Sequence, residues 1–140
     1  MNIVLSLIIA VSSIQVSGWE IFADTRYKLE WVEELGADVE LPIFSDKLKA
    51  MDGKEITLTG HYLPMEMRGK SIILSQMPFS SCFFCGGDVG QESIAEVIFK
   101  GKKQQFRPDQ LLTIKGKLKL NVDDFDHLAL VLEDAVVVRS

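Results

Sequence analysis

The sequence predicts a mainly β fold: a small antiparallel, OB-like barrel of five to six strands with one short helix before the first barrel strand. Five runs of alternating apolar and polar residues lie between residues 54 and 138, and alternation with period two is typical of strands. Two of these runs carry a glycine near the middle, Gly60 and Gly116, where small barrels need bends. The length of 140 residues fits one domain. A β-sandwich is the alternative, because strand number alone does not fix closure.

Residues 1–18 are predicted to be a cleaved secretory signal. The first 16 residues are almost wholly apolar, and their apolar core of about nine residues is too short to cross a bilayer as a helix. Val16 and Gly18 suit the small-residue positions of a signal-peptidase site. No Lys or Arg precedes the apolar run, so an uncleaved anchor and a buried first strand are the alternatives. Cleavage would leave an exported chain without a membrane span, in the periplasm or cell envelope.

Residues 19–44 form a lead-in segment before the barrel domain, which covers residues 45–140. Apolar and charged residues alternate over 27–31, which predicts a half-buried strand. Gly36 would turn the chain into a return strand that Pro42 ends. A helix is the alternative, because the apolar residues of this stretch also recur every four positions.

The next segment, residues 45–53, has the signals of one or two helical turns. Ser45 can cap the first amide groups, and Gly53 can take the left-handed conformation at the end. Leu48 and Met51 are three residues apart and therefore share one face.

The barrel strands follow the helical segment. We expect them at residues 54–64, 71–76, 93–100, 112–120 and 128–138. In the first of them Ile56, Leu58 and Tyr62 face inward, and His61 faces outward with the threonines. Only about ten residues separate the third and fourth strands, so the helix that OB-folds usually have there is not expected.

Four segments of the chain resemble a family of small exported bacterial proteins that have an OB-like barrel and no assigned activity. The most specific is the loop Pro78-Phe79-Ser80-Ser81-Cys82-Phe83-Phe84-Cys85-Gly86-Gly87. The others are residues 52–64, 90–93 and 115–121. The resemblance implies export, the barrel and a structured cysteine loop, and it implies no reaction.

Cys82 and Cys85, the two cysteines of the chain, have three interpretations. In an oxidising compartment they would pair as a disulfide, which closes a short loop and adds about 2 kcal/mol. They could instead hold a soft metal, since thiolates bind zinc, and thiolates with thioethers bind copper(I). The additional ligands available are Met65, Met67, Met77, His61 and His127. Thiol redox catalysis is the third interpretation, but redox pairs usually start a helix, and Gly86-Gly87 disfavours one.

The shape of this loop is set by Pro78, Phe79, Phe83, Phe84, Gly86 and Gly87. An exposed contact patch is one interpretation of the three phenylalanines. We expect them instead to plug one end of the barrel, because large exposed aromatic clusters are rare on monomers.

The net charge of −5 and pI of about 5.0 disfavour nucleic-acid binding. Lys115, Lys117 and Lys119 form a possible basic strip, but a solvated strand face explains them better. The sequence contains no Ser-His-Asp order, phosphate loop or His-Glu-x-x-His motif. We therefore expect an exported binding or scaffolding module of the cell envelope rather than an enzyme, with an envelope protein or a small ligand as partner and no cofactor. The alternative is a zinc- or copper-binding or thiol-redox protein that uses the cysteine loop.

Overall fold

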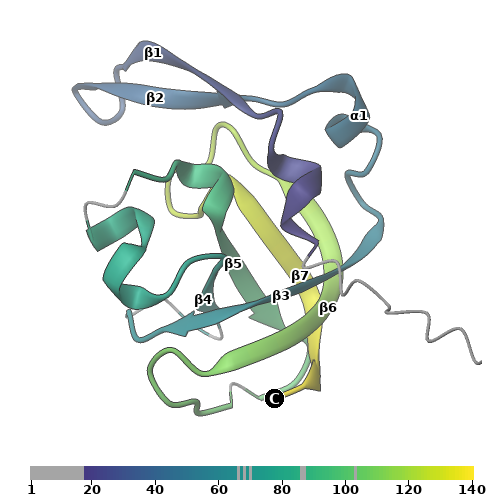
Figure 1. Cartoon of the computed structure of the whole chain (residues 1–140). Helices are drawn as coiled ribbons and strands as arrows, with labels where there is room; N and C mark the ends of the chain where they lie inside the picture. Colours follow the sequence, from purple (N-terminus) through teal and green to yellow (C-terminus); the bar gives the residue numbers. More distant parts are fainter. Residues whose placement is uncertain (1–17, 66, 68, 70, 86–87, 103) are drawn as a thin grey trace, which may run out of the picture.

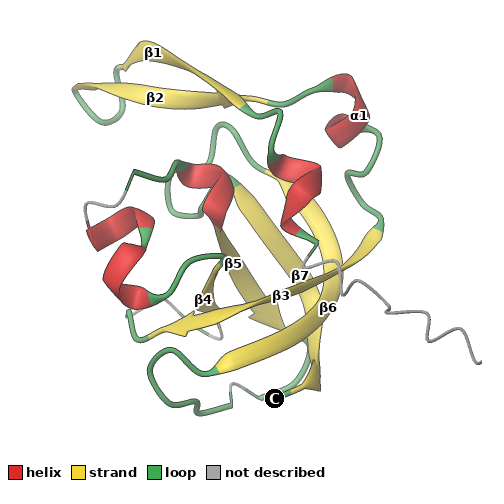
Figure 2. Ribbon diagram, viewed as in Figure 1, coloured by secondary structure: helices red, strands yellow, loops and turns green. Residues whose placement is uncertain are grey.

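The computed structural model describes residues 18–65, 67, 69, 71–85, 88–102 and 104–140. Among these residues, five strands close into a barrel in the order β3-β4-β5-β7-β6 (Figure 1, Figure 2). They are β3 (Glu55–Leu63), β4 (Ser71–Ser75), β5 (Ile94–Phe99), β6 (Leu111–Leu120) and β7 (Leu130–Arg139). The predicted mainly β, OB-like barrel is confirmed.

One pair of neighbouring strands corrects the expectation of an antiparallel barrel. β5 and β7 run parallel, with Glu96 opposite Val131 and Val97 opposite Leu132, whereas the other four pairs in the ring are antiparallel. A closed ring with an odd number of strands cannot alternate direction all the way round. Five strands and closure therefore require a parallel pair.

The two mid-strand glycines lie where another strand approaches closely, more so at Gly60 than at Gly116. A Cβ on Gly60 would lie 2.6 Å from the carbonyl oxygen of Ser75 on β4. A Cβ on Gly116 would lie 3.1 Å from the carbonyl oxygen of Glu133 on β7. The register of β6 and β7 shifts at this point, and Asp134 has a positive φ of 49°, so β7 bulges opposite Gly116.

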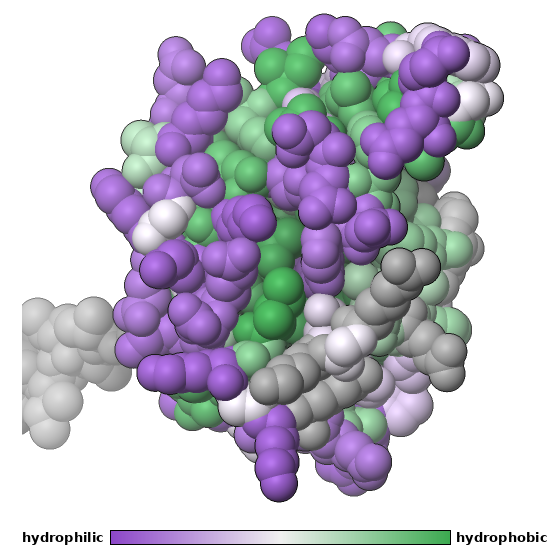
Figure 3. Space-filling view, turned by 180° about the vertical axis from the view of Figure 1, so that it is seen from behind, coloured by the Kyte–Doolittle hydropathy of each residue, from purple (hydrophilic) through white to green (hydrophobic). Residues whose placement is uncertain are grey.

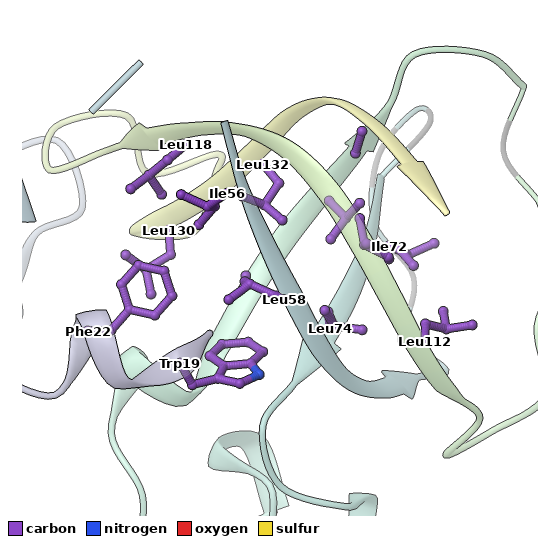
Figure 4. Packing of buried hydrophobic residues seen from close by; sticks show 14 of the residues in the cluster. Trp19, Phe22, Ile56, Leu58, Ile72, Leu74, Leu112, Leu118, Leu130 and Leu132 are labelled. Atoms are coloured by element: carbon purple, nitrogen blue, oxygen red, sulfur yellow. The ribbon is translucent and has the colours of Figure 1, made fainter. Parts of the chain in front are cut away.

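Two aromatic residues from the lead-in segment complete the core inside the barrel. Trp19 and Phe22 lie on the short 3-10 helix η1 (Trp19–Phe22) and pack with Leu58 and Leu130 (Figure 4). The indole Nε1 of Trp19 donates to the carbonyl oxygen of Thr59 at 2.8 Å. Between β5 and β6 the described residues form no helix, so η1 supplies apolar contacts from the N-terminal side instead.

The predicted short helix is α1 (Asp46–Lys49). The Oγ of Ser45 accepts a hydrogen bond from the backbone N–H of Leu48 at 3.1 Å, and Gly53 has a φ of 81°. Leu48 is buried and Met51 packs beside it against the core. The N-cap at Ser45, the left-handed conformation of Gly53 and the shared face of Leu48 and Met51 are therefore as predicted.

The lead-in segment forms the favoured hairpin rather than a helix. Strands β1 (Arg26–Val32) and β2 (Ala37–Ile43) pair antiparallel, and Gly36 turns the chain with a φ of 60°. Two details differ from the prediction. Pro42 lies within β2 opposite Tyr27 instead of ending the strand. On β1, Leu29 and Trp31 of the predicted half-buried face are exposed, whereas Glu30 and Val32 on the other face are partly buried. The hairpin stands beyond the end of the barrel as a separate two-stranded sheet (Figure 1).

Three further 3-10 helices lie between β4 and β5: η2 (Phe79–Ser81), η3 (Phe83–Cys85) and η4 (Gln91–Ser93). No helix in the described part of the chain is long and apolar enough to cross a membrane. The predicted signal, residues 1–18, lies outside the described residues except for Gly18, and it stays a prediction.

Candidate functional site

The cysteine loop covers the outside of the barrel. Cys82 is fully buried in a second apolar cluster with Leu63, Ile73 and Ile94, which we call the outer cluster. These residues come from β3, β4 and β5 and are separate from the cluster inside the barrel. A strand that faces the interior on one side and the outer cluster on the other is buried on both sides. In β4, all five residues are buried.

Cys82 itself is not a free thiol. Its surroundings are apolar, and reactive cysteines lie in partly exposed, electropositive places. The side chain of Cys85 and the residues Gly86 and Gly87 lie outside the described part of the structure, so the disulfide between Cys82 and Cys85 stays a prediction.

The expectation that three phenylalanines plug the barrel is wrong. Phe83 packs against the outer cluster, and Phe79 and Phe84 are 44% and 41% exposed. Phe83 and Phe84 meet edge to face with their centroids 5.3 Å apart. Because η1 already fills the interior with Trp19 and Phe22, the loop aromatics are left outside. Pro78 precedes η2 in an extended conformation and so directs the loop into its first turn.

The candidate metal ligands are only partly brought together. Met65 and Met67 pack against the outer cluster that holds Cys82. The backbone N–H of Met77 instead donates to the Oγ of Ser75, and Nδ1 of His61 lies 3.2 Å from the carbonyl oxygen of Asp109. The described residues contain no group of three or more His, Cys, Asp or Glu residues placed to hold a metal ion.

His127 is engaged by a buried carboxylate that the sequence analysis missed. Glu96 on β5 is buried, and its oxygens lie 2.9 and 3.1 Å from Nδ1 of His127. The carboxylate also accepts from the Oγ of Ser71 at 2.9 Å and from the backbone N–H of Leu128 at 3.1 Å. The hydrogen bond to Glu96 raises the pKa of His127. The side-chain amide of Asn121 holds the same loop through the carbonyl oxygens of residues 124, 127 and 128.

No sequence signal would have paired these groups, because Glu96 and His127 are 31 residues apart and neither belongs to a motif. Only the parallel pairing of β5 and β7 brings the loop before β7 over β5. A cavity of about 50 Å³ lies beside His127, with Ile98, Lys119 and Val131 in its lining. This volume accommodates no more than a few water molecules.

The lysines of β6 belong to a solvated strand face. Lys115 lies 3.4 Å from Glu55, and Lys119 lies 3.5 Å from Glu133. Both pairs are exposed and cross to a neighbouring strand. These partners neutralise part of the possible basic strip.

A broad hollow in the described surface lies away from the cysteine loop. It has a volume of about 720 Å³ and is lined by Ala23, Asp24, Thr25, Arg26, Ile43, Phe44, Ser45, Asp46 and Lys49. The hollow is broad and open, and its charged lining combines two acidic with two basic side chains. It therefore selects for no one class of ligand.

The hairpin has a fixed base and an exposed outer part. At the base, the hydroxyl of Tyr27 donates to the carboxylate of Glu92 and accepts from the backbone N–H of that residue at 2.9 Å. Burial, and then the hydrogen bond to Glu92, raise the pKa of Tyr27. Further out, Leu29 and Trp31 are 66% and 60% exposed. In the view from behind, apolar and hydrophilic side chains lie next to one another along the upper edge of the molecule, where the hairpin lies (Figure 3).

The comparisons with known proteins identify no family. No family model and no curated protein matches the chain. Among solved structures, the chain is similar to a DUF3299 family protein from Pseudomonas aeruginosa PAO1, with a TM-score of 0.48 and 17% sequence identity. The alignment covers 66% of this chain and 66% of that protein, slightly less than two thirds of its length. A likeness of this strength carries no functional inference.

Proposed function

We propose that this chain is an exported binding or scaffolding module of the cell envelope, and that it contacts a partner protein through the β1–β2 hairpin. The observation that carries the proposal is the exposure of Leu29 and Trp31 on neighbouring positions of one hairpin face. Exposed apolar side chains that lie together mark interaction sites, and tryptophan is enriched among the residues that dominate binding energy.

The rest of the molecule supports this role as a rigid base. Among the described residues, each barrel strand has a neighbouring strand on both sides, which limits the edges that are open to further pairing. The hairpin is joined to it through Tyr27 and Glu92, and through Gln91, whose side-chain amide donates to the carbonyl oxygen of Glu40. A contact surface held at its base loses little conformational entropy when it binds.

Export is supported by the predicted signal and by the state of the cysteines. Cys82 is not a free thiol, and Cys85 is the other cysteine of the chain. We propose that the two form a disulfide that fixes the loop. Intact-mass measurement of the purified mature protein after thiol alkylation, with and without reductant, tests this. We expect no alkylation without reductant and two adducts with it, on a chain that begins at Trp19.

The soft-metal and thiol-exchange alternatives have less support. Full burial of Cys82 among aliphatic side chains favours a structural sulfur over a reactive one. Elemental analysis of protein purified without chelator tests the soft-metal alternative, because stoichiometric zinc or copper would support it.

The contact surface is tested by photo-crosslinking in cells. A photoreactive amino acid replaces Leu29 in one variant and Val138, which is 53% exposed on β7, in the control. We expect a discrete adduct from position 29 and none from position 138. The captured protein is then purified, and its affinity should fall at least about tenfold with Trp31→Ala. Equal adducts from both positions, or binding unaffected by Trp31→Ala, would contradict the proposal.

A further inference from the structure

We propose that β1 binds an extended segment of the partner as a third strand, and that this segment combines aliphatic with basic side chains. The inference rests on the proposed function, because it specifies how the hairpin makes its contact. Three features of the hairpin support it: an open edge, an apolar face and acidic residues on that same face.

The two edges of the hairpin differ in what they face. Gln91 donates to the carbonyl oxygen of Glu40 at 3.1 Å, so the outer edge of β2 faces η4 and the barrel. Leu29 is directly opposite Glu40. In an antiparallel pair, two directly opposite residues either exchange backbone hydrogen bonds or both point their N–H and C=O groups toward the outer edges. Because the carbonyl of Glu40 points to Gln91, the N–H and C=O of Leu29 point away from β2. The same holds two residues to either side, at Tyr27 and Trp31.

This outer edge of β1 is unpaired in the described part of the chain. β1 pairs with β2 alone, and the backbone groups of Tyr27, Leu29 and Trp31 make no hydrogen bond outside the hairpin among the described residues. β1 lies on the side of the hairpin that faces away from the barrel (Figure 1). An extended peptide can therefore approach it without displacing any described element.

The face that an added strand would extend is apolar and acidic. Directly opposite residues share a face, so Leu29 lies beside Glu40 and Trp31 beside Asp38. The side chains on this face are Tyr27, Leu29, Trp31, Asp38, Glu40 and Pro42. The two basic residues of the hairpin, Arg26 and Lys28, lie on the opposite face, where Lys28 pairs with Glu30. The first face thus has uncompensated negative charge.

These features determine the chemistry of the partner. A two-stranded hairpin is marginally stable in water, and a third strand stabilises it. Aliphatic side chains at alternate positions of the added strand would cover Leu29 and Trp31. Lysine or arginine at other positions of that face would lay their methylene stems over the same residues and reach Asp38 and Glu40 with their charged ends. Backbone pairing supplies affinity and alternate side chains supply specificity, as in other cases of strand addition.

A peptide panel tests the inference on the purified mature protein. Peptides of about eight residues, the length of a strand, carry valine at alternate positions of one face and lysine, serine or glutamate at the remaining positions of that face. We expect the lysine series to bind at least about tenfold more tightly than the glutamate series. In ¹⁵N NMR spectra the amides of Leu29 and Trp31 should shift and gain protection from hydrogen exchange. Absence of binding by every peptide at about 1 mM overturns the inference.

Backbone pairing is tested separately from side-chain contact. N-methylation of alternate peptide amides removes the donors that face β1 and should abolish binding. On the protein, Leu29→Pro removes the outward N–H, which proline tolerates on an edge strand, and Leu29→Ala keeps it. We expect Leu29→Pro to weaken binding at least about tenfold more than Leu29→Ala does. Equal binding by methylated and unmethylated peptides overturns strand addition. If the crosslinked partner still depends on Trp31 in that case, the proposed function stands and the mode of contact is wrong.

Discussion

The two tryptophans of the chain show how the barrel and the hairpin differ. Trp19 is 2% exposed and Trp31 is 60% exposed, although only 12 positions separate them. Trp19 enters the barrel core, where Phe22 and Leu58 surround it. Trp31 lies on a sheet of two strands, and the one hydrogen bond of its indole goes to the adjacent Glu33 at 2.8 Å. The comparison shows that a residue's apolar character predicts a preference for burial, whereas burial itself requires a second layer of structure.

The largest expected difference between the regions comes from truncating these tryptophans. Trp19→Ala should lower the free energy of unfolding by about 3–5 kcal/mol, because it leaves a cavity in the core and the carbonyl of Thr59 without its donor. Trp31→Ala, the matched control, should change it by less than about 0.5 kcal/mol. Urea unfolding followed by circular dichroism measures both. Comparable losses would mean that the hairpin belongs to the same cooperative core as the barrel.

A methyl group added to a barrel glycine should have the next largest effect. Gly60→Ala places a Cβ 2.6 Å from a backbone oxygen of β4, and we expect a loss of about 1–3 kcal/mol in the free energy of unfolding. Gly101→Ala is the control, since nothing lies within 4 Å of the added Cβ. Thermal unfolding of the three proteins decides the point. A Gly60→Ala protein as stable as the control would show that β3 and β4 can separate freely.

Much of the fold was predictable because its signals are local. The alternation within β3 and β6 and the glycines at their bends determine strands and curvature within a few residues. The cap at Ser45 and the exit at Gly53 similarly need only their neighbours. The parallel pair of β5 and β7 follows from the strand count with closure, an argument that the antiparallel expectation overlooked. The exposure of Leu29 was not predictable, because alternation does not show whether anything covers the apolar face.

The candidate sites divide in the same way. The sequence singled out Cys82 because its loop concentrates unusual residues. Its burial against Leu63, Ile73 and Ile94 was not predicted, because it depends on where the loop folds back over three strands. The partner of His127 was not predictable, because Glu96 is one polar position within a strand that looks ordinary. The contact depends on a long-range pairing of strands, which no local pattern records.

The Glu96–His127 pair should make barrel stability depend on pH. Hydrogen bonding to Glu96 raises the pKa of His127 from 6.5, with Asp124 raising it further and Lys119 lowering it. Because the folded-state pKa lies above the unfolded value, the contribution is fully present below about pH 6.5 and is lost as the pH rises through the raised pKa. Since His127 is partly exposed, we expect at most about 1 kcal/mol.

His127→Gln tests this contribution. The glutamine keeps a donor toward Glu96 but does not titrate, so its free energy of unfolding should change less between about pH 5 and pH 8 than that of the wild type. The matched control is His61→Gln, which should retain the wild-type dependence. Urea unfolding at several pH values measures the three proteins. A His127→Gln profile parallel to the wild type would show that the pair does not couple protonation to folding.

The smallest expected effect on the free energy of unfolding comes from a substitution at the base of the hairpin. This substitution best distinguishes the stability of the hairpin from that of the barrel. Tyr27→Phe removes the hydroxyl that bonds Glu92 while keeping the ring. We expect the global free energy of unfolding to change by less than about 0.5 kcal/mol, because the hairpin can open while the barrel stays folded. Native-state hydrogen exchange should nevertheless speed up at the amides paired between β1 and β2 and stay unchanged in β4 and β5. Gln91→Ala, which removes the bond to Glu40, should produce the same local pattern. If exchange in β4 rises in step with exchange in β1, the hairpin and the barrel unfold as one unit. The surface that carries Leu29 and Trp31 would then not open independently of the barrel.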